Sequence, residues 1–214
     1  MKITLFFITC SLLVPRESDS QTITPDLQDR KLWSASNRSI NNVEENGKKG
    51  IKIEAGDGSN LLTLNNASFS NGTIELDLKG RNLMGQSFVG FAFHIQNDST
   101  YDAVYFRPFN FSNPDTIRRW RAVQYISLPK YEWDKLRAEF PGKYENKVNP
   151  VPNGDHWFHC KLVIKGRQIS VFVDNSSVPS LVVNKLWDTT DGKIGLWVEN
   201  GSEGSFANLK INRE

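Results

Sequence analysis

Short runs in which apolar and polar side chains alternate constrain the fold of this chain more than any other feature. In residues 72–79, Ile74, Leu76 and Leu78 alternate with polar residues, and Gln168–Val173 repeats the pattern. Successive side chains of a β-strand point to opposite faces, so such a run buries one face and exposes the other. Gly, Asn, Asp and Pro separate these runs, and helical periodicity is nearly absent. The sequence therefore predicts an all-β protein.

The number and spacing of the runs further limit which β architectures are possible. The strand signal is clearest at residues 72–79, 88–95, 101–107, 121–127, 157–165, 168–173, 193–198 and 205–212. Phe88–Ile95 is apolar on both faces, which is typical of a central strand, and Gly166-Arg167 marks a hairpin turn. Roughly a dozen strands without a repeating unit of about 20–50 residues favour two packed antiparallel sheets over a propeller.

The beginning of the chain has the pattern of a secretory signal peptide. An apolar run from Ile3 to Val14 is followed by small residues, and we expect residues 1–20 to be removed before Gln21. The run is shorter than the roughly 20 apolar residues that a membrane-spanning helix needs. Lipidation at Cys10 is the alternative. We therefore expect a single domain over residues 21–214, secreted or periplasmic.

Charge and cysteine content exclude several classes of partner. The formal net charge is only +2, so the chain lacks the basic footprint of a nucleic-acid-binding protein or of a polybasic membrane patch. After the leader the one cysteine is Cys160, which lies in an apolar run and is expected to be a buried hydrophobe. A secreted chain without an internal disulfide fits a bacterial envelope better than an animal extracellular domain.

Aromatic residues and arginines concentrate in residues 101–145. This stretch holds 11 of the 24 aromatic residues and 5 of the 11 arginines. A hydrophobic core has little use for guanidinium groups or tyrosine hydroxyls, whereas sugars offer flat C–H faces to rings and hydroxyls to charged groups. Carbohydrate is therefore the expected partner. The alternative is a long ordered loop, with a helical turn at Glu132–Phe140, whose rings fill a second small core.

Two consecutive predicted strands and the loop that follows them supply the candidate binding residues. Tyr105 and Arg107 share one face of their strand, whereas Gln124 and Tyr125 point to opposite faces of theirs. We expect these strands and the loop to border one cleft. The expected ligand-binding residues are Tyr105, Arg107, Tyr125, Trp133, Arg137 and Glu139.

Candidates for acid–base chemistry are few. His94 has small alternate neighbours that would leave room above the sheet, although a lone histidine on a strand is more often structural. Glu139 and Glu145 are the best-placed carboxylates of the loop, and the alternative is that a glutamate pairs with Arg137 and holds the loop in place. The sequence leaves open whether the protein is an enzyme.

Two charged clusters have two interpretations each. Glu75 and Asp77 share one strand face, as the paired carboxylates of a glycosidase could, but alternating charge on a solvated face explains them equally well. The run Arg118-Arg119-Trp120-Arg121 is either a solvated positive edge or a site for a uronic or sulfated sugar, because arginine binds carboxylate and sulfate in bidentate fashion.

Signals for a metal or a cofactor are poor. His156 and His159 precede and begin a predicted strand, where positions three apart face opposite sides and cannot share an ion. The chain has no Gly-rich phosphate loop and no dinucleotide-binding fingerprint. We therefore expect no metal and no cofactor.

The C-terminal strands resemble those of a known superfamily. Gly192-Lys-Ile-Gly-Leu-Trp-Val and Phe206-Ala-Asn-Leu-Lys-Ile resemble the last two strands of concanavalin A-like lectin/glucanase jelly rolls, and Phe69–Lys79 is similar to an opening strand. The resemblance implies a jelly-roll β-sandwich of two antiparallel sheets with a carbohydrate site on its concave face. Some jelly rolls carry a structural Ca²⁺, so that ion stays open as an alternative.

A narrower resemblance concerns secreted bacterial domains of the laminin G-like and 3-keto-disaccharide hydrolase types. Their concave-face strands have counterparts here in Tyr105-Phe-Arg107 and Ala122–Tyr125. This resemblance leaves three functions open. The first is a domain that recognises a glycan on its concave face. The second is a glycan-degrading enzyme, either a glycoside hydrolase or a 3-keto-sugar hydrolase or lyase. The third is a structural envelope domain without a small ligand.

Overall fold

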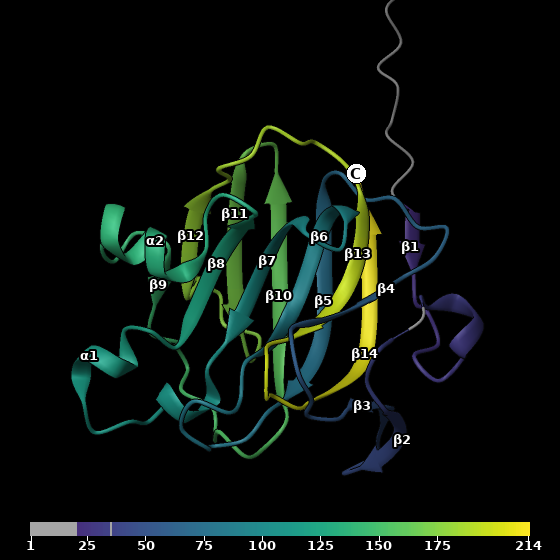
Figure 1. Cartoon of the computed structure of the whole chain (residues 1–214), viewed down its shortest axis with the longest axis horizontal. Helices are drawn as coiled ribbons and strands as arrows, with labels where there is room; N and C mark the ends of the chain where they lie inside the picture. Colours follow the sequence, from purple (N-terminus) through teal and green to yellow (C-terminus); the bar gives the residue numbers. More distant parts are fainter. Residues whose placement is uncertain (1–20, 35) are drawn as a thin grey trace, which may run out of the picture.

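The computed structural model describes residues 21–34 and 36–214 (Figure 1). The expected signal peptide and the alternative lipidation site lie outside these residues. The described chain forms two antiparallel sheets packed face to face, which confirms the predicted jelly-roll β-sandwich. None of the helices in the described ranges has the length and hydropathy needed to cross a membrane.

The larger sheet has eight strands and contains both ends of the described chain. In spatial order it consists of β12 (Leu181–Asn184), β11 (Gln168–Val173), β10 (Phe158–Lys165), β5 (Gly72–Lys79), β14 (Gly204–Arg213), β3 (Lys48–Ile53) and β2 (Ile40–Glu45). Strand β1 (Gln21–Ile23) pairs with the C-terminal part of β14, so the two ends of the described chain lie side by side.

The smaller sheet has six strands and carries most of the irregular structure. In spatial order it consists of β4 (Asn60–Thr63), β13 (Lys193–Val198), β6 (Val89–Asn97), β7 (Thr100–Phe106), β8 (Val123–Leu128) and β9 (Glu145–Asn146). Two short helices, α1 (Thr116–Arg119) and α2 (Trp133–Glu139), lie beside its β8–β9 end (Figure 1). Single 3-10 turns occur at Arg30–Leu32 and Pro108–Asn110.

The core lies between the sheets and follows from the alternation in the sequence. Ile74, Leu76 and Leu78 of β5 are fully buried, as the two-residue periodicity predicts. Across the core, the ring of Phe106 on β7 packs edge-to-face on Phe158 of β10, with centroids 5.0 Å apart. Cys160 is buried in the same layer, as expected, and this burial raises the pKa of its thiol well above the usual value.

The eight predicted runs coincide with strands to within about two residues, and β6 is the expected central strand between β13 and β7. The long connection between Pro129 and Pro152 is ordered. It forms α2, close to the predicted helical turn, and then β9, which pairs with β8 and extends the sheet. Leu136 of α2 is buried and anchors the helix. This connection therefore forms a wall at one end of the smaller sheet.

Candidate functional site

A row of paired residues crosses the smaller sheet and sets the floor of the candidate site. Strand pairing aligns Leu61 with Trp197, Trp197 with Gly90, and Gly90 with Tyr105. Beyond these, Tyr105 pairs with Gln124, and Gln124 with Glu145. Directly paired residues of an antiparallel sheet project to the same face. Because Phe106 points into the core, this row lies on the face directed away from the larger sheet.

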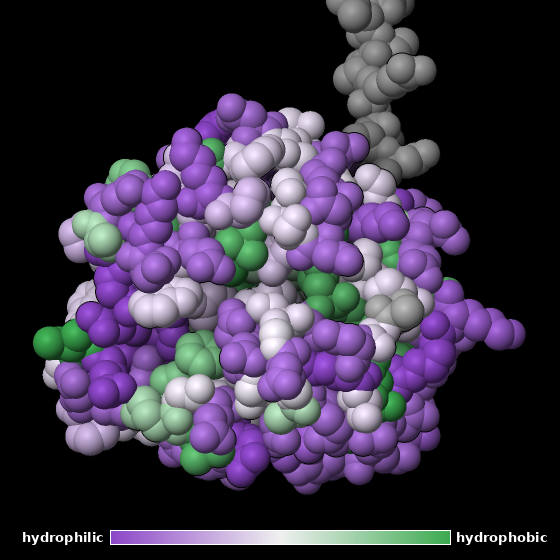
Figure 2. All heavy atoms as spheres, viewed as in Figure 1, coloured by the Kyte–Doolittle hydropathy of each residue, from purple (hydrophilic) through white to green (hydrophobic). Residues whose placement is uncertain are grey.

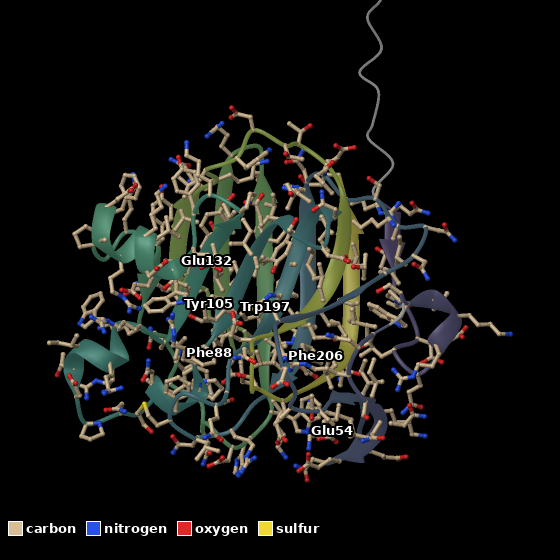
Figure 3. All side chains as sticks on the ribbon, in the orientation of Figure 1. Glu54, Phe88, Tyr105, Glu132, Trp197 and Phe206 are labelled. Atoms are coloured by element: carbon tan, nitrogen blue, oxygen red, sulfur yellow. The ribbon has the colours of Figure 1, made fainter. Side chains whose placement is uncertain are left out.

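A glycine allows two rings to meet in the middle of that row. Gly90 lies between Trp197 and Tyr105, and a Cβ atom on it would come within 2.7 Å of the Tyr105 Cβ. Without that Cβ, the rings of Tyr105 and Trp197 approach to 4.8 Å between centroids (Figure 3). Phe88 packs edge-on against Tyr105 at 6.1 Å and against Phe109 at 5.3 Å. The floor is therefore aromatic and tightly packed.

Phe88, Tyr105 and Phe109 border a cavity of about 310 Å³, which is within the range of small-molecule sites. Its lining residues are Met84, Gly85, Phe88, Tyr105, Arg107, Phe109, Asn110, Arg118, Arg121, Trp133, Arg137 and Glu199. In the space-filling view, hydrophobic side chains reach the surface in the middle of this face among polar ones (Figure 2). Aromatic rings next to charged groups give the cavity both flat apolar walls and hydrogen-bonding groups.

Arg107 fixes the inner end of the cavity. Its Nη1 donates to the Arg121 carbonyl at 2.9 Å, and its Nη2 donates to the Tyr105 hydroxyl at 2.7 Å. The guanidinium lies over the Tyr105 ring, 4.9 Å from its centroid. Burial lowers the pKa of Arg107 below its usual value, and the neighbouring guanidinium of Arg137 acts in the same direction.

The Tyr105 hydroxyl has a free proton for a ligand. It accepts from Arg107, and among the described residues it donates to no acceptor. Burial raises the pKa of Tyr105 to about 12, so the hydroxyl stays protonated at neutral pH. A buried ring that borders the cavity therefore presents an O–H donor as well as an apolar face.

Helix α2 supplies the second wall through Trp133 and Arg137. Arg137 donates through Nε and Nη2 to the two oxygens of Glu145, at 2.9 and 2.6 Å, and lies 4.9 Å from the Trp133 ring centroid. The hydrogen bonds to Glu145 raise the pKa of Arg137. The ion pair holds α2 against β9 and supports Trp133, which is 43% exposed.

Helix α1 supplies Arg118, and Arg121 follows the C-cap of the same helix. The Asp115 carboxylate caps the helix by accepting from the Ile117 N–H at 2.8 Å. Arg118 Nη1 contacts the Met84 sulfur at 3.1 Å, and Arg121 Nε lies 3.8 Å from Glu145. The short helix and the residues that follow it thus place two partly exposed guanidinium groups in the cavity lining.

The opposite wall is acidic. Glu199, just after β13, accepts through Oε1 from the Ser59 hydroxyl and the Asn200 N–H, both at 2.8 Å. Its Oε2 has no hydrogen-bond partner in the described part of the chain. Burial raises the pKa of Glu132, and the carboxylates of Asp134 and Glu199 raise it further. Glu132 directly precedes α2, so the charge of Glu199 reaches across to a carboxyl group beside the α2 wall.

The structure brings four of the six expected ligand-binding residues together around one cavity. Tyr105, Arg107, Trp133 and Arg137 line it. Glu139 does not, because it lies on the exposed side of α2, where its carboxylate is 3.9 Å from Lys135. Glu145 lies beneath the lining, and both of its oxygens are engaged by Arg137, which leaves it no role as a free base.

Tyr125 and His94 lie inside the sandwich and do not reach the cavity. Tyr125 pairs with Val104, not with Tyr105, and its hydroxyl donates to Asp102 at 2.6 Å. His94 lies at a bulge of β6 with φ of 51°, and its Nε2 is 2.9 Å from the Ser70 carbonyl oxygen. The expected space above His94 is absent, because the bulge turns the ring into the core, where it is 1% exposed.

The carboxylate pair of β5 lies on the other side of the molecule. Asp77 accepts from Lys48 Nζ at 2.6 Å and from the Asn208 amide at 2.7 Å, and His159 Nδ1 is 3.0 Å away. Glu75 is 3.5 Å from the same histidine. Asp77 is buried and engaged by these partners on the outer face of the larger sheet, outside the cavity lining, which favours a structural role for the pair.

Sequence reasoning missed part of the lining. Phe88 directly precedes β6 and Phe109 follows β7, and the pairing of these two strands brings both rings to the cavity. Glu199 lies in a Glu-Asn-Gly turn, and nothing in the sequence separates that turn from other strand ends. The sequence left two interpretations open for Arg118 and Arg121, and the structure places both residues in the cavity lining. The described residues contain no group of three or more His, Cys, Asp or Glu side chains suited to a metal ion.

Comparison with protein families gives a match over nearly the whole described chain. Residues 26–212 match the model of the 3-keto-alpha-glucoside-1,2-lyase-like domain. This match bears out the narrower of the two sequence resemblances. A comparison with curated protein sequences finds no significant match.

Solved structures share the fold at low sequence identity. A carbohydrate binding module, CBM66, from Bacillus subtilis is 16% identical, with a TM-score of 0.60 over 84% of this chain and 95% of that one. A Bacillus licheniformis beta-glucanase is 13% identical, with a TM-score of 0.55 over 92% and 100%. A putative glycosyl hydrolase from Parabacteroides distasonis is 16% identical, with a TM-score of 0.53 over 86% and 89%. These likenesses establish the concanavalin A-like fold.

Proposed function

Because the chain belongs to the 3-keto-alpha-glucoside-1,2-lyase-like domain family, we propose that the cavity on its smaller sheet binds a carbohydrate. The observation that carries the proposal is the lining itself, in which the exposed Trp133 and the half-buried Phe88 offer ring surfaces beside Arg107 and Glu199. Rings cover the C–H faces of a sugar, while guanidinium and carboxylate groups bond its hydroxyls. The cavity is open, whereas a structural domain would be expected to fill this face with side chains.

The individual groups suit sugar hydroxyls. Within the described ranges, Tyr105 has an unused O–H donor, and Glu199 has an unused acceptor in Oε2. Trp133 is exposed but held in place by its contact with Arg137, so a sugar can stack on it with little loss of side-chain freedom. The names of the similar structures, a carbohydrate binding module and a beta-glucanase, motivate the same ligand class.

A second candidate function is lyase chemistry at the same site. The family description names a 1,2-lyase acting on 3-keto glucosides. In such a sugar the C2–H is acidic because it lies next to the C3 ketone. A base that removes this proton forms the C1–C2 double bond as the C1–O bond breaks, and the leaving oxygen takes up a proton. Glu199 is the best-placed base, since one oxygen is held by Ser59 while the other is free.

A glycan array, followed by a cleavage assay, tests both candidates. Wild-type protein is expected to bind at least one glycan on the array. Glu199→Gln keeps the shape of the side chain and removes its basicity, so it should retain binding and lose any release of aglycone from a 3-keto glucoside. Glu203→Gln is the matched control, because Glu203 pairs with Lys52 on the larger sheet. Absence of binding to any glycan would contradict the proposed function.

A location outside the cytoplasm is part of the proposal. A glycan-binding role fits the signal-peptide pattern of residues 1–20 and a secreted or periplasmic protein whose domain spans residues 21–214. Intact-mass analysis of the exported protein should give a chain that begins at or near Gln21. A full-length product that stays in the cytoplasm would contradict this location.

A further inference from the structure

We propose that the sugar bound in this cavity carries an anionic group, a carboxylate or a sulfate ester, and that Arg118 and Arg121 bind it. The inference rests on the proposed function, since it specifies which sugars the cavity accepts. It follows from the charge balance of the lining and from which N–H groups of the arginines are already in use.

The arginines of the lining outnumber the carboxylates that neutralise them. Glu145 lies 2.6 Å from Arg137, 3.8 Å from Arg121 and 3.9 Å from Arg107, so three guanidinium groups share one carboxylate. Asp115 is 3.6 Å from Arg118, and both of these side chains are about half exposed. At partly buried positions such an excess of positive charge attracts an anion.

Arg107 and Arg137 are committed to the protein. Arg107 donates to the Arg121 carbonyl and to Tyr105, and its neighbour Gln124 accepts at 3.4 Å. Arg137 uses Nε and Nη2 in its bidentate bond to Glu145. These two arginines therefore shape the cavity and position the Trp133 ring, and they have few donors left for a ligand.

Arg118 and Arg121 are free by comparison. Among the described residues the Arg121 guanidinium donates no hydrogen bond, and its one carboxylate neighbour is beyond hydrogen-bond distance. Arg118 donates only to the Met84 sulfur, a weak acceptor that a ligand oxygen can replace. Both side chains line the cavity. Their planar forks match the paired oxygens of a carboxylate or sulfate.

The acidic wall fixes the orientation of such a sugar. Glu199 lines the same cavity, and its carboxylate would repel an anionic group while accepting hydrogen bonds from hydroxyls. The anionic substituent of the sugar is thus directed to the Arg118 and Arg121 side, and its hydroxyls to Glu199. A merely solvated positive edge would not place these two arginines around an aromatic-lined cavity with a carboxylate opposite.

Calorimetric titrations with matched oligosaccharides test the inference after the array has identified the bound backbones. Oligogalacturonate is compared with its neutral methyl ester, and a sulfated galactan oligosaccharide with its desulfated form. We expect the charged member of at least one pair to bind about tenfold more tightly, or better, than its neutral form. This preference should weaken as the salt concentration rises, because ions screen the attraction.

Arginine variants test which residues recognise the charged group of the sugar. Arg118→Gln and Arg121→Gln, separately and together, should reduce the affinity for the charged member about tenfold more than the affinity for the neutral member. Arg81→Gln is the matched control, because Arg81 is a half-exposed arginine that pairs with Glu203 outside the cavity lining. Thermal unfolding of each variant verifies that it is folded.

The outcomes separate the inference from the proposed function. Equal affinity for charged and neutral members would overturn the anionic preference and leave sugar binding standing. A preference that survives in the Arg118→Gln, Arg121→Gln double variant would also overturn the inference, because the charge would then be recognised elsewhere. Binding to no glycan of the array would overturn both. The two charged probes distinguish a uronic acid from a sulfated sugar.

Discussion

The two outward faces of the sandwich use the same kinds of residues in opposite ways. On the larger sheet, Asp77 receives hydrogen bonds from Lys48 and Asn208 and contacts His159, so each charge of this network has a close partner. On the smaller sheet, three arginines share Glu145, and aromatic side chains border an open cavity. The comparison teaches that a high density of charged residues does not by itself identify a binding site. Charged residues that share too few partners and lie beside exposed aromatic rings do identify one.

The largest expected effect is a loss of stability on the smaller sheet, where three arginines share Glu145. Glu145→Gln removes the carboxylate that three guanidinium groups share, and Glu145 is only 7% exposed. We expect the free energy of unfolding to fall by about 3–5 kcal/mol in urea denaturation, because buried guanidinium charge is left uncompensated. Glu139→Gln, on the exposed side of α2, is the control and should change it by less than about 0.5 kcal/mol. Equal effects of the two changes would contradict the account of this wall.

The corresponding change on the larger sheet should cost less. Asp77→Asn weakens the contacts with Lys48, Asn208 and His159, and we expect a loss of about 1–3 kcal/mol in unfolding free energy. Asp77 is itself buried, but its charged partners Lys48 and His159 are partly exposed, so water compensates part of the loss, whereas Arg107 beside Glu145 is buried. Glu44→Gln, which breaks an exposed pair with Lys49, is the control. A loss larger than that of Glu145→Gln would reverse the comparison between the faces.

A substitution of Trp133 should affect glycan binding but not the stability of the fold. Because this ring is 43% exposed and lines the cavity, Trp133→Ala should weaken glycan binding about tenfold, or about 1.4 kcal/mol, with little change in thermal stability. Trp120→Ala is the matched control, since Trp120 is 50% exposed but lies outside the lining. Arg107→Ala is not an equivalent test, because Arg107 is buried and its removal should also destabilise the fold. Equal loss of binding in both tryptophan variants would argue against a site at this cavity.

The smallest expected effect is the pH dependence of the larger sheet. Hydrogen bonding to Asp77, with the nearby charge of Glu75, raises the pKa of His159, so its stabilisation is full below about pH 6.5 and is lost as pH rises through the raised value. The pKa of Asp77 is lowered to about 2 by its partners, despite burial, so its stabilisation is present above about pH 3.9 and is lost as pH falls toward 2.

This network is therefore strongest between about pH 4 and pH 6.5. Solvent screens His159, so unfolding free energy should decline by less than about 1 kcal/mol between pH 6 and pH 9 on its account. Denaturation curves of the wild type and of His159→Gln over this range measure the effect. The variant should show the flatter dependence, and parallel curves would contradict the assignment.

The sequence predicted the fold well because alternation is a local signal. The burial of Ile74, Leu76 and Leu78 follows from side-chain direction alone, and so do the strand bounds. Six strands were not predicted, namely β1, β2, β3, β4, β9 and β12, and β4 and β9 among them are short and defined by pairing with neighbours distant in the sequence. Glu145 illustrates the consequence: its place beneath the cavity depends on the pairing of β9 with β8.

The candidate site could be predicted only in part. The aromatic and arginine density of residues 101–145 pointed to the correct region, but two neighbouring strands had to be placed in register before Tyr105 and Tyr125 could be assigned to opposite faces. For His94, a bulge changed the direction of the side chain, and the bulge has no signal in the sequence. Glu199 lies in a turn that is distant in the sequence from residues 101–145, so only the folded arrangement brings it to the cavity.

Indole N–H signals in a two-dimensional NMR titration test the central claim most directly, because tryptophans mark both faces. Trp133 lines the cavity, whereas the Trp157 Nε1 donates to Glu45 on the larger sheet at 3.2 Å. Tryptophan-to-phenylalanine variants assign the two signals, and a glycan that the array identifies is then added to saturation. We predict that the Trp133 signal shifts and the Trp157 signal does not. A shift of Trp157 with Trp133 unchanged would place the sugar on the wrong face and contradict the account.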